Sequence, residues 1–256
     1  MKKHIQKKCL FEVDMPDNTL ELLGGKGIST STPLKVNEIP KNFNAISITE
    51  DNKAIMCFPF NDSGRLVYIP EPNPILIYFD SAYSHFKAIT DRRKTLLNHF
   101  KGVKMDENYL NDLYAFYGSV NGFIILLFTA IEAFINYNIP EEYEYIVKSD
   151  RKTEIYNKNQ IMLLPFKEKM GPILKGIFKK DFSHSHKLKY QHIINLKGIR
   201  DNIVHLKPEK GTNTPYAYLF KKELTFKFEA TIDAVMDFIN FYKPGYIKYC
   251  PCSKDF

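Results

Sequence analysis

Two residues near the end of one predicted helix, Arg200 and His205, have the types and spacing that cleavage of a phosphodiester needs. Arginine carries a permanent charge on a planar fork that matches phosphate oxygens. Histidine exchanges protons near neutral pH and can act as a general acid or base. Because RNA carries its own nucleophile, the ribose 2′-hydroxyl, this pair predicts strand cleavage that needs neither a metal nor another cofactor.

A second pair with similar spacing, Arg93 and His99, lacks the same surroundings. Arg93 lies between two other basic residues, and no carboxylate stands four residues before His99. This pattern predicts a solvated helix face. In contrast, Asp201 stands four residues before His205, so on a helix the two share a face. Asp201 is therefore expected to orient the imidazole of His205.

The helix that must position the first pair is expected over residues 185–206. Apolar residues recur there at helical intervals, and Pro208 ends the pattern. On an ideal helix Arg200 and His205 lie about 140° apart, so one chain focuses them poorly on one phosphate. Two such helices that meet across a twofold axis bring both pairs into one cleft. The spacing therefore predicts a homodimeric site.

The segment Ile199-Arg200-Asp201-Asn202-Ile203-Val204-His205 resembles the arginine–polar–x–x–x–histidine motif of the HEPN-superfamily ribonucleases. Residues 128–136 resemble the buried helix that precedes the motif helix in many members. The similarity covers about residues 74–246. It implies an all-helical domain that dimerises and cleaves RNA without a metal. Many members are toxins or antiviral (abortive infection) effectors, whereas others have lost activity and serve as binding modules.

Three more polar residues are candidates for supporting roles. Glu132 and Asn136 are four apart on an otherwise apolar helix, where a carboxylate needs a partner. Glu132 is expected either to position Arg200 or to border the cleft with Asn136; the alternative is a structural polar network between helices. Asn202 is expected to contact RNA or to form a hydrogen bond at the dimer interface.

Composition is that of an ordinary globular protein, with 44% hydrophobic and 25% charged residues among 256. The net charge of +7 suits an anionic partner such as RNA. The basic N-terminus is not followed by the apolar core of a secretory signal. The longest apolar run, residues 123–135, contains Thr129 and Glu132 and is too short to span a bilayer. These features predict a cytoplasmic protein with no membrane contact.

The fold is expected to be mainly α, a HEPN-like helical bundle preceded by a small β-rich N-terminal region. Residues 1–73 contain short alternating runs separated by turn residues, and a proline-rich boundary at residues 70–74 precedes the helical domain, residues 74–256. A glycine cluster at residues 24–27 is read as a loop. Helices are predicted over residues 75–100, 106–137, 141–164, 166–180 (broken at Gly171-Pro172), 185–206 and 222–242; residues 216–228 also have strand character.

Two groups of metal-ligating residue types have simpler interpretations. Cys250 and Cys252 form the only close cysteine pair, and no second pair completes four ligands, so reduced bystander thiols are expected. His184 and His186 alternate with serines at a predicted helix start, where Ser183 or Ser185 would cap the helix and the histidines would be solvated.

Two function classes follow. The first is a metal-independent endoribonuclease in which His205 is the general acid/base and Arg200 clamps the phosphate, with Asp201 and Asn202 orienting them. An antitoxin or regulatory protein is a possible partner of such an enzyme. The second is an inactive helical adaptor that binds a protein or RNA. A weaker third idea, nucleotide sensing or transfer by residues 1–73, has no supporting motif.

Overall fold

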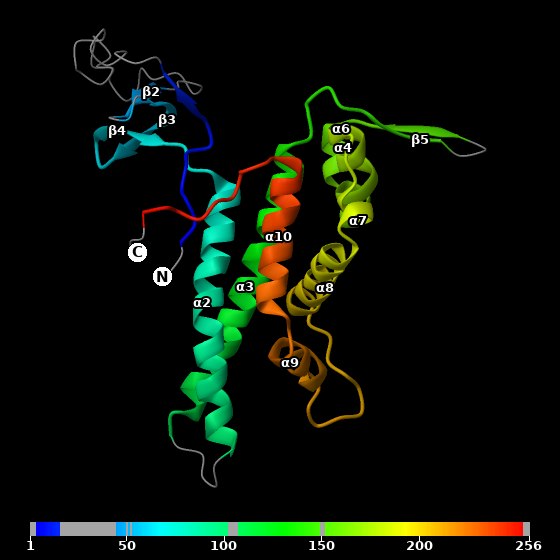
Figure 1. The fold of residues 1–256 in the computed structure, drawn as a ribbon. Helices are drawn as coiled ribbons and strands as arrows, with labels where there is room; N and C mark the ends of the chain where they lie inside the picture. The colour runs from blue at the N-terminus through cyan, green and yellow to red at the C-terminus, as the bar shows by residue number, and fades with distance from the viewer. Residues whose placement is uncertain are drawn as a thin grey trace. The chain divides into compact units, whose positions relative to one another are not determined.

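The computed structural model describes residues 4–15, 45–49, 51, 53–101, 107–148 and 152–252 (Figure 1). Packing divides the chain into two units, which we describe separately. The β unit is Gln6–Leu76, and the helical unit runs from Ile77 onward. His4 and Ile5 belong to the helical unit, because Ile5 forms a β-bridge with Tyr249. The fold is mainly α, as the sequence predicts.

The β unit is a four-stranded antiparallel sheet built around one long strand. Strand β3 (Lys53–Asp62) pairs with β1 (Glu12–Asp14), β2 (Ala45–Ile48) and β4 (Arg65–Pro70). Ser63 and Gly64 connect β3 to β4 with φ of 51° and 90°, and a two-residue loop with both φ positive matches the right-handed twist of a hairpin. The short strands expected in this region are confirmed; the glycine cluster at 24–27 lies outside the described residues.

Two long antiparallel helices form one side of the helical unit. Helix α2 (Pro74–Lys101) begins where the Asn73 side chain accepts hydrogen bonds from the N–H groups of Ile75 and Leu76, at 3.1 and 3.3 Å. Helix α3 (Tyr109–Tyr137) follows, with Asn108 in the cap position. Both helices agree with the sequence prediction, although residue 106, where the second was expected to begin, lies outside the described residues.

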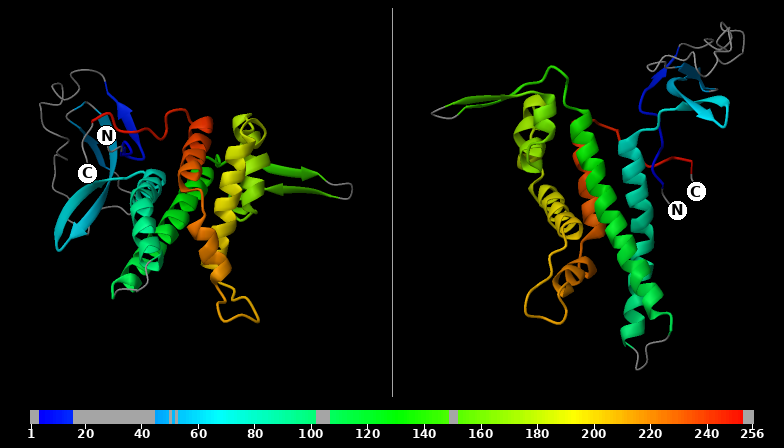
Figure 2. Two further views of the ribbon diagram at one scale, coloured as in Figure 1. Left: turned by 60° about the horizontal axis from the view of Figure 1, so that its bottom comes forward. Right: turned by 180° about the vertical axis from the view of Figure 1, so that it is seen from behind.

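Residues 141–164 do not form the predicted polar helices. They form a hairpin of β5 (Tyr145–Lys148) and β6 (Thr153–Tyr156), followed by the short helix α4 (Lys158–Met162). Figure 2 shows the hairpin extending outward from the helices of this unit. Tyr143, Tyr145 and Tyr156 pack on a small apolar cluster of Ile139, Ile161 and Ile173. This tertiary contact outweighs the helix propensity of the Glu- and Lys-rich sequence.

The chain then winds through short helical pieces into the motif helix. Helix α5 (Phe166–Glu168), the π-helical turn η2 (Lys169–Ile173, with Pro172 inside it) and α6 (Leu174–Phe178) form the broken segment predicted at Gly171-Pro172. Helix α7 (Phe182–Ser185) leads into α8 (Lys187–Val204), the motif helix. Helices α9 (Ala217–Leu224) and α10 (Phe228–Tyr242) complete the unit, so residues 216–228 are mostly helical.

The core of the helical unit is aromatic and is centred on α3, which packs against α8 and α10 (Figure 1). Phe123 and Phe134 of α3 contact Phe228 and Phe238 of α10 edge to face, with centroids 5.4 and 6.0 Å apart. The whole of α3 is long and apolar enough to cross a membrane, with a mean hydropathy of 1.8 over 18 residues. The expectation that it is too short was based on residues 123–135 alone. Because 56% of the 18-residue window is buried, we interpret α3 as the central helix of the bundle.

Candidate active site

Arg200 points from α8 toward α3 and is held on three sides. Its Nη2 donates to Glu132 Oε2 at 3.4 Å, and its Nη1 lies 3.1 Å from Asp201 Oδ1. The guanidinium carbon lies 4.0 Å from the centre of the Phe128 ring, close enough for a cation–π interaction. The Arg200 side chain is 21% exposed. Glu132 therefore has the position expected of a residue that orients Arg200.

Asp201 contacts cations rather than the imidazole of His205. Its Oδ1 faces Arg200, and its Oδ2 accepts a hydrogen bond from Lys197, one helical turn earlier. The link to His205 is made by the backbone, since the carbonyl of Asp201 accepts the N–H of His205 at 2.9 Å. Of the two roles expected for the Asp201 carboxylate, orienting Arg200 and orienting His205, the structure supports the first.

His205 lies just beyond the last turn of α8. The helix ends at Val204, and His205 occupies the C-cap with φ −117° and ψ 60°. Its side chain is exposed, as is that of Asn202. Within the described residues no hydrogen bond joins Arg200 to His205. One chain therefore presents the arginine partly buried and the histidine in solvent.

A buried lysine extends the polar network on the other side of Glu132. Lys169 is 5% exposed and donates to Asn136 Oδ1 at 3.3 Å and to the carbonyl of Met162 at 3.1 Å. Burial lowers the pKa of the Lys169 ammonium, and the charge of Glu132 partly offsets this. Asn136 thus partners Lys169 rather than bordering a cleft with Glu132, which favours the structural interpretation of Asn136.

Sequence reasoning missed Lys169. Its backbone begins the π-helical turn η2, which contains Pro172; proline lacks the N–H of a regular helical turn, and π-turns are common at functional sites. The sequence signal was the lysine just before Gly171-Pro172 in an apolar segment. Its partner Asn136, 33 residues earlier, depends on tertiary packing that no local pattern records.

A groove of about 420 Å³ lies along α8 beside the motif. Asn202 lines it, and it also lines a smaller pocket with Leu206 and Tyr218 near the end of α8. Three basic or titratable side chains and no carboxylate are among the described residues that line the groove: His192, Ile194, Asn195, Gly198, Ile199, Asn202, Lys222, Thr225, Phe226 and Lys227. This composition suits an anionic ligand with planar groups.

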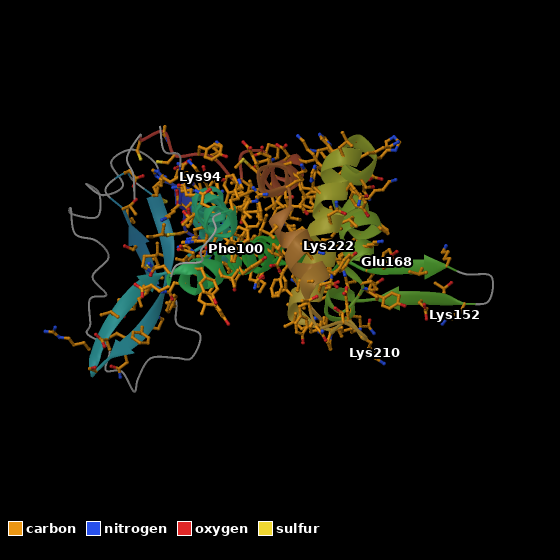
Figure 3. All side chains as sticks on the ribbon, turned by 90° about the horizontal axis from the view of Figure 1, so that it is seen from below. Lys94, Phe100, Lys152, Glu168, Lys210 and Lys222 are labelled. Carbon is orange, nitrogen blue, oxygen red and sulfur yellow. The ribbon has the colours of Figure 1, made fainter. Side chains whose placement is uncertain are left out.

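A second groove, of about 600 Å³, shares Thr225, Phe226 and Lys227 with the first and runs between α2 and the start of α10. It adds Arg93, Lys94 and Lys101, and again no carboxylate lies among its described lining residues. Figure 3 views the molecule from this end, with Lys94 on α2 and Lys222 on α9 labelled. The two grooves meet at Thr225, Phe226 and Lys227; the first lies along α8, whereas no α8 residue is among the described residues that line the second.

The predicted solvated face of α2 is confirmed for Arg92, Arg93 and Lys94, which are exposed, but not for His99, which is partly buried and paired. His99 Nε2 lies 2.6 Å from Asp112 Oδ2 on α3, and its side chain is 14% exposed. Arg92 donates to the carbonyl of Ala115, and Arg93 Nε donates to the carbonyl of Leu224 at 3.0 Å. These side chains fasten α2 to its neighbours.

The histidines near α7 also differ from expectation. Asp181, not a serine, caps α7 by accepting the N–H of His184 at 3.1 Å. The hydroxyl of Ser183 and then other donors lower the pKa of Asp181 to about 2. His186 is not solvated, because its ring stacks on Phe182 with centroids 4.9 Å apart and its Nδ1 is buried. Neither histidine contributes to the candidate site.

Among the described residues, one group has donor atoms close enough together to hold a metal ion: His4, Cys250 and Cys252.

Comparison with protein-family models, with curated proteins and with solved structures finds no match to this chain. The function must therefore be argued from the chemistry of the site itself.

Proposed function

We propose that this protein is a HEPN-type, metal-independent endoribonuclease that acts as a homodimer. Arg200 clamps the scissile phosphate, and His205 is the general acid/base. The observation that carries this proposal is the arrangement on α8, where a guanidinium oriented by two carboxylates and an aromatic ring precedes an exposed histidine by five residues. Asn202 of the same helix lines a basic groove that has no carboxylate among its described lining residues, although neither Arg200 nor His205 lines it.

The reaction follows from these two groups. His205 accepts the proton of the ribose 2′-hydroxyl, whose oxygen attacks the adjacent phosphorus. The bond to the 5′-oxygen breaks, and an imidazolium returns a proton to that leaving group. Arg200 stabilises the negative charge that builds on the phosphate oxygens. The products are a 2′,3′-cyclic phosphate and a 5′-hydroxyl.

The homodimer is proposed because residues on both sides of His205 are apolar and exposed. Val204 is 51% exposed and Leu206 is 55% exposed. Apolar side chains at a site are better buried by a partner than left in water. A twofold axis beside Val204 and Leu206 would place the His205 of each chain opposite the motif helix of the other chain. Arg200 of that other chain would then complete the site, because the Arg200 and His205 of one protomer do not meet.

RNA is the proposed substrate, with the basic grooves as its path. Lys222 and Lys227 would contact the backbone, and Phe226 and His192 offer flat surfaces for bases. Phosphate contacts dominate such affinity, so binding should weaken steeply with salt. A toxin or antiviral effector in the cytoplasm, restrained by an antitoxin or another protein, is the biological role that the resemblance implies and that we carry into this proposal.

The test is cleavage of total RNA by the purified full chain in the presence of a chelator. Wild type is expected to cut, and His205→Ala is expected to lose about a hundredfold or more. His184→Ala is the matched control, because His184 is also exposed but lies on α7. Equal activity in wild type and His205→Ala, or cleavage that the chelator abolishes, would refute the proposal.

A second candidate, a non-catalytic adaptor, is favoured by the pairing of Arg200 with both Glu132 and Asp201. These carboxylates compensate the charge that a clamp must offer to phosphate. An adaptor would bind RNA or a protein without cutting RNA, and its expression in bacteria would not slow growth. The enzyme is expected to arrest growth in a His205-dependent manner.

A further inference from the structure

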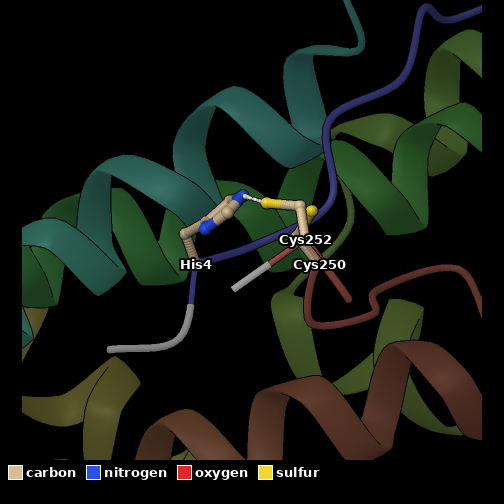
Figure 4. A group of neighbouring side chains, drawn as sticks. All are labelled: His4, Cys250 and Cys252. Carbon is tan, nitrogen blue, oxygen red and sulfur yellow. Dashed lines mark hydrogen bonds between the residues drawn. The ribbon is translucent and has the colours of Figure 1, made fainter. Parts of the chain in front are cut away.

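Two segments from opposite ends of the described chain run side by side in the helical unit. Ile5 forms an antiparallel β-bridge with Tyr249, and the N–H of Cys250 donates to the carbonyl of His4 at 2.8 Å. This pairing fixes the backbone on which three donor side chains stand. As a result His4, Cys250 and Cys252 are neighbours in space (Figure 4), although the sequence separates the histidine from the cysteines by almost its full length.

The separations of the donor atoms fit one small cation. Cys252 Sγ lies 3.5 Å from His4 Nε2, and the ligand atoms of all three residues lie within 4.8 Å of one another. Tetrahedral Zn²⁺, with bonds of about 2.3 Å to sulfur and 2.05 Å to nitrogen, requires a sulfur–nitrogen separation of about 3.6 Å and a sulfur–sulfur separation of about 3.8 Å. The cluster therefore needs little rearrangement to surround the ion.

The chemistry of the donor set selects the metal. Thiolate and imidazole are the ligands that zinc prefers, whereas magnesium and calcium prefer oxygen. Two thiolates also neutralise the charge of a divalent ion. Pro251 restricts the backbone between the two cysteines, so less conformational freedom is lost when both bind. His4 supplies the ligand that the sequence alone did not connect with the cysteine pair.

We propose that His4, Cys250 and Cys252 bind one Zn²⁺ ion, with water in the fourth position. The ion would fasten the segment before the β unit to the segment after α10. The site lies apart from the Arg200 and His205 chemistry and does not depend on it. A disulfide between Cys250 and Cys252 is the competing state of the same sulfur atoms and is an outcome of the test.

The test is titration of the reduced, metal-free full chain with Co²⁺, a spectroscopic substitute for zinc, followed by displacement with Zn²⁺. We expect one Co²⁺ per chain, a thiolate-to-cobalt charge-transfer band in the near ultraviolet, and the strong visible bands of tetrahedral cobalt. Zn²⁺ should abolish both. Cys250→Ser, Cys252→Ser and His4→Ala should each weaken binding by about tenfold or more.

Cys9→Ser is the matched control, because Cys9 is another partly exposed cysteine in the chain, located in the β unit. It should leave the titration unchanged. The proposal is overturned if the charge-transfer band is missing, if His4→Ala binds as tightly as wild type, or if intact mass of protein purified without reductant shows that the two cysteines form a disulfide that excludes metal. None of these measurements depends on ribonuclease activity.

Discussion

Glu223 on α9 is the group whose replacement should change stability most clearly. Its residue is 1% exposed, and neither carboxylate oxygen has a hydrogen-bond partner within the described part of the chain. Burial raises the pKa of Glu223 from 4.5 to about 7. Tyr117 is close enough that the charge of Glu223 adds to the burial that raises the pKa of the tyrosine. The folded state therefore favours a protonated, neutral Glu223.

The sign of the pH effect follows from linkage. Between pH 4.5 and about 7 the folded chain keeps a proton that the unfolded chain has lost, so the free energy of unfolding falls by about 1.4 kcal/mol per pH unit. The favourable contribution is complete below pH 4.5 and is lost by about pH 7. Over this window the pKa difference corresponds to about 3 kcal/mol. Glu223→Gln removes the charge and keeps the shape of the side chain.

The expected result is a difference between variant and wild type that grows with pH. Glu223→Gln should equal wild type near pH 4.5 and exceed it by about 3 kcal/mol at pH 8. Urea unfolding followed by tyrosine fluorescence measures this, because the chain has 16 tyrosines and no tryptophan. Glu141→Gln is the control, since that carboxylate is 74% exposed and should shift stability by less than about 0.5 kcal/mol. A variant that is less stable than wild type at pH 8, or a difference that does not change with pH, would refute the reasoning.

Three other predictions concern packing, the motif and acid stability. Gly122→Ala should lower the free energy of unfolding by about 1–3 kcal/mol, because a Cβ would lie 2.6 Å from a histidine ring of α2. Gly118→Ala should raise this free energy by up to about 1 kcal/mol, because a Cβ there has nothing within 4 Å. Urea unfolding measures both. Glu132→Gln should cost about 1–2 kcal/mol in thermal unfolding and lower kcat for RNA more than RNA affinity, and an unchanged kcat would contradict its orienting role. The Ser183 hydroxyl above all lowers the pKa of Asp181 from 3.8 to about 2, so the Asp181 carboxylate stabilises the fold above pH 3.8 and this stabilisation is lost as the pH falls through 2. In an acid titration followed by circular dichroism, Asp181→Asn should reduce the stability lost over this range by about 1 kcal/mol.

Elements with strong local signals were predictable from the sequence. The strands of the β unit, the long helices α2 and α3 and the break at Gly171-Pro172 each follow from periodicity, turn residues or proline. The hairpin at residues 141–164 was not, because its short strands alternate over only four residues each and lie in a Glu- and Lys-rich segment. The packing of Tyr145 and Tyr156 on the cluster of Ile139, Ile161 and Ile173 decides its structure.

The candidate site was predictable in its members but not in its contacts. The motif and the acidic residue on α3 were identified, and the pairing of Glu132 with Arg200 agrees with one of the two expected roles. Asp201 pairs with Lys197 and Arg200 of its own helix, contacts that the spacing allows but that were not foreseen. The pairing of Asn136 with Lys169 was not foreseen because it depends on which helix faces which. For the same reason His99 looked solvated in the sequence, although its carboxylate partner comes from the next helix.

The pairing of Arg200 with two carboxylates is compatible with a phosphate clamp because each carboxylate has a second cation. Asp201 also accepts from Lys197, and Glu132 lies near enough to Lys169 to raise the pKa of its ammonium against the effect of burial. A phosphate that displaced either carboxylate would therefore leave it with another cation nearby, and water would screen the remaining charge because the side chains are 34% exposed at Glu132 and 35% exposed at Asp201. Phe128 would keep the guanidinium plane in place during such an exchange. Under the proposed function, the network that fastens α8 to α3 would thus also let Arg200 exchange a carboxylate for an RNA phosphate.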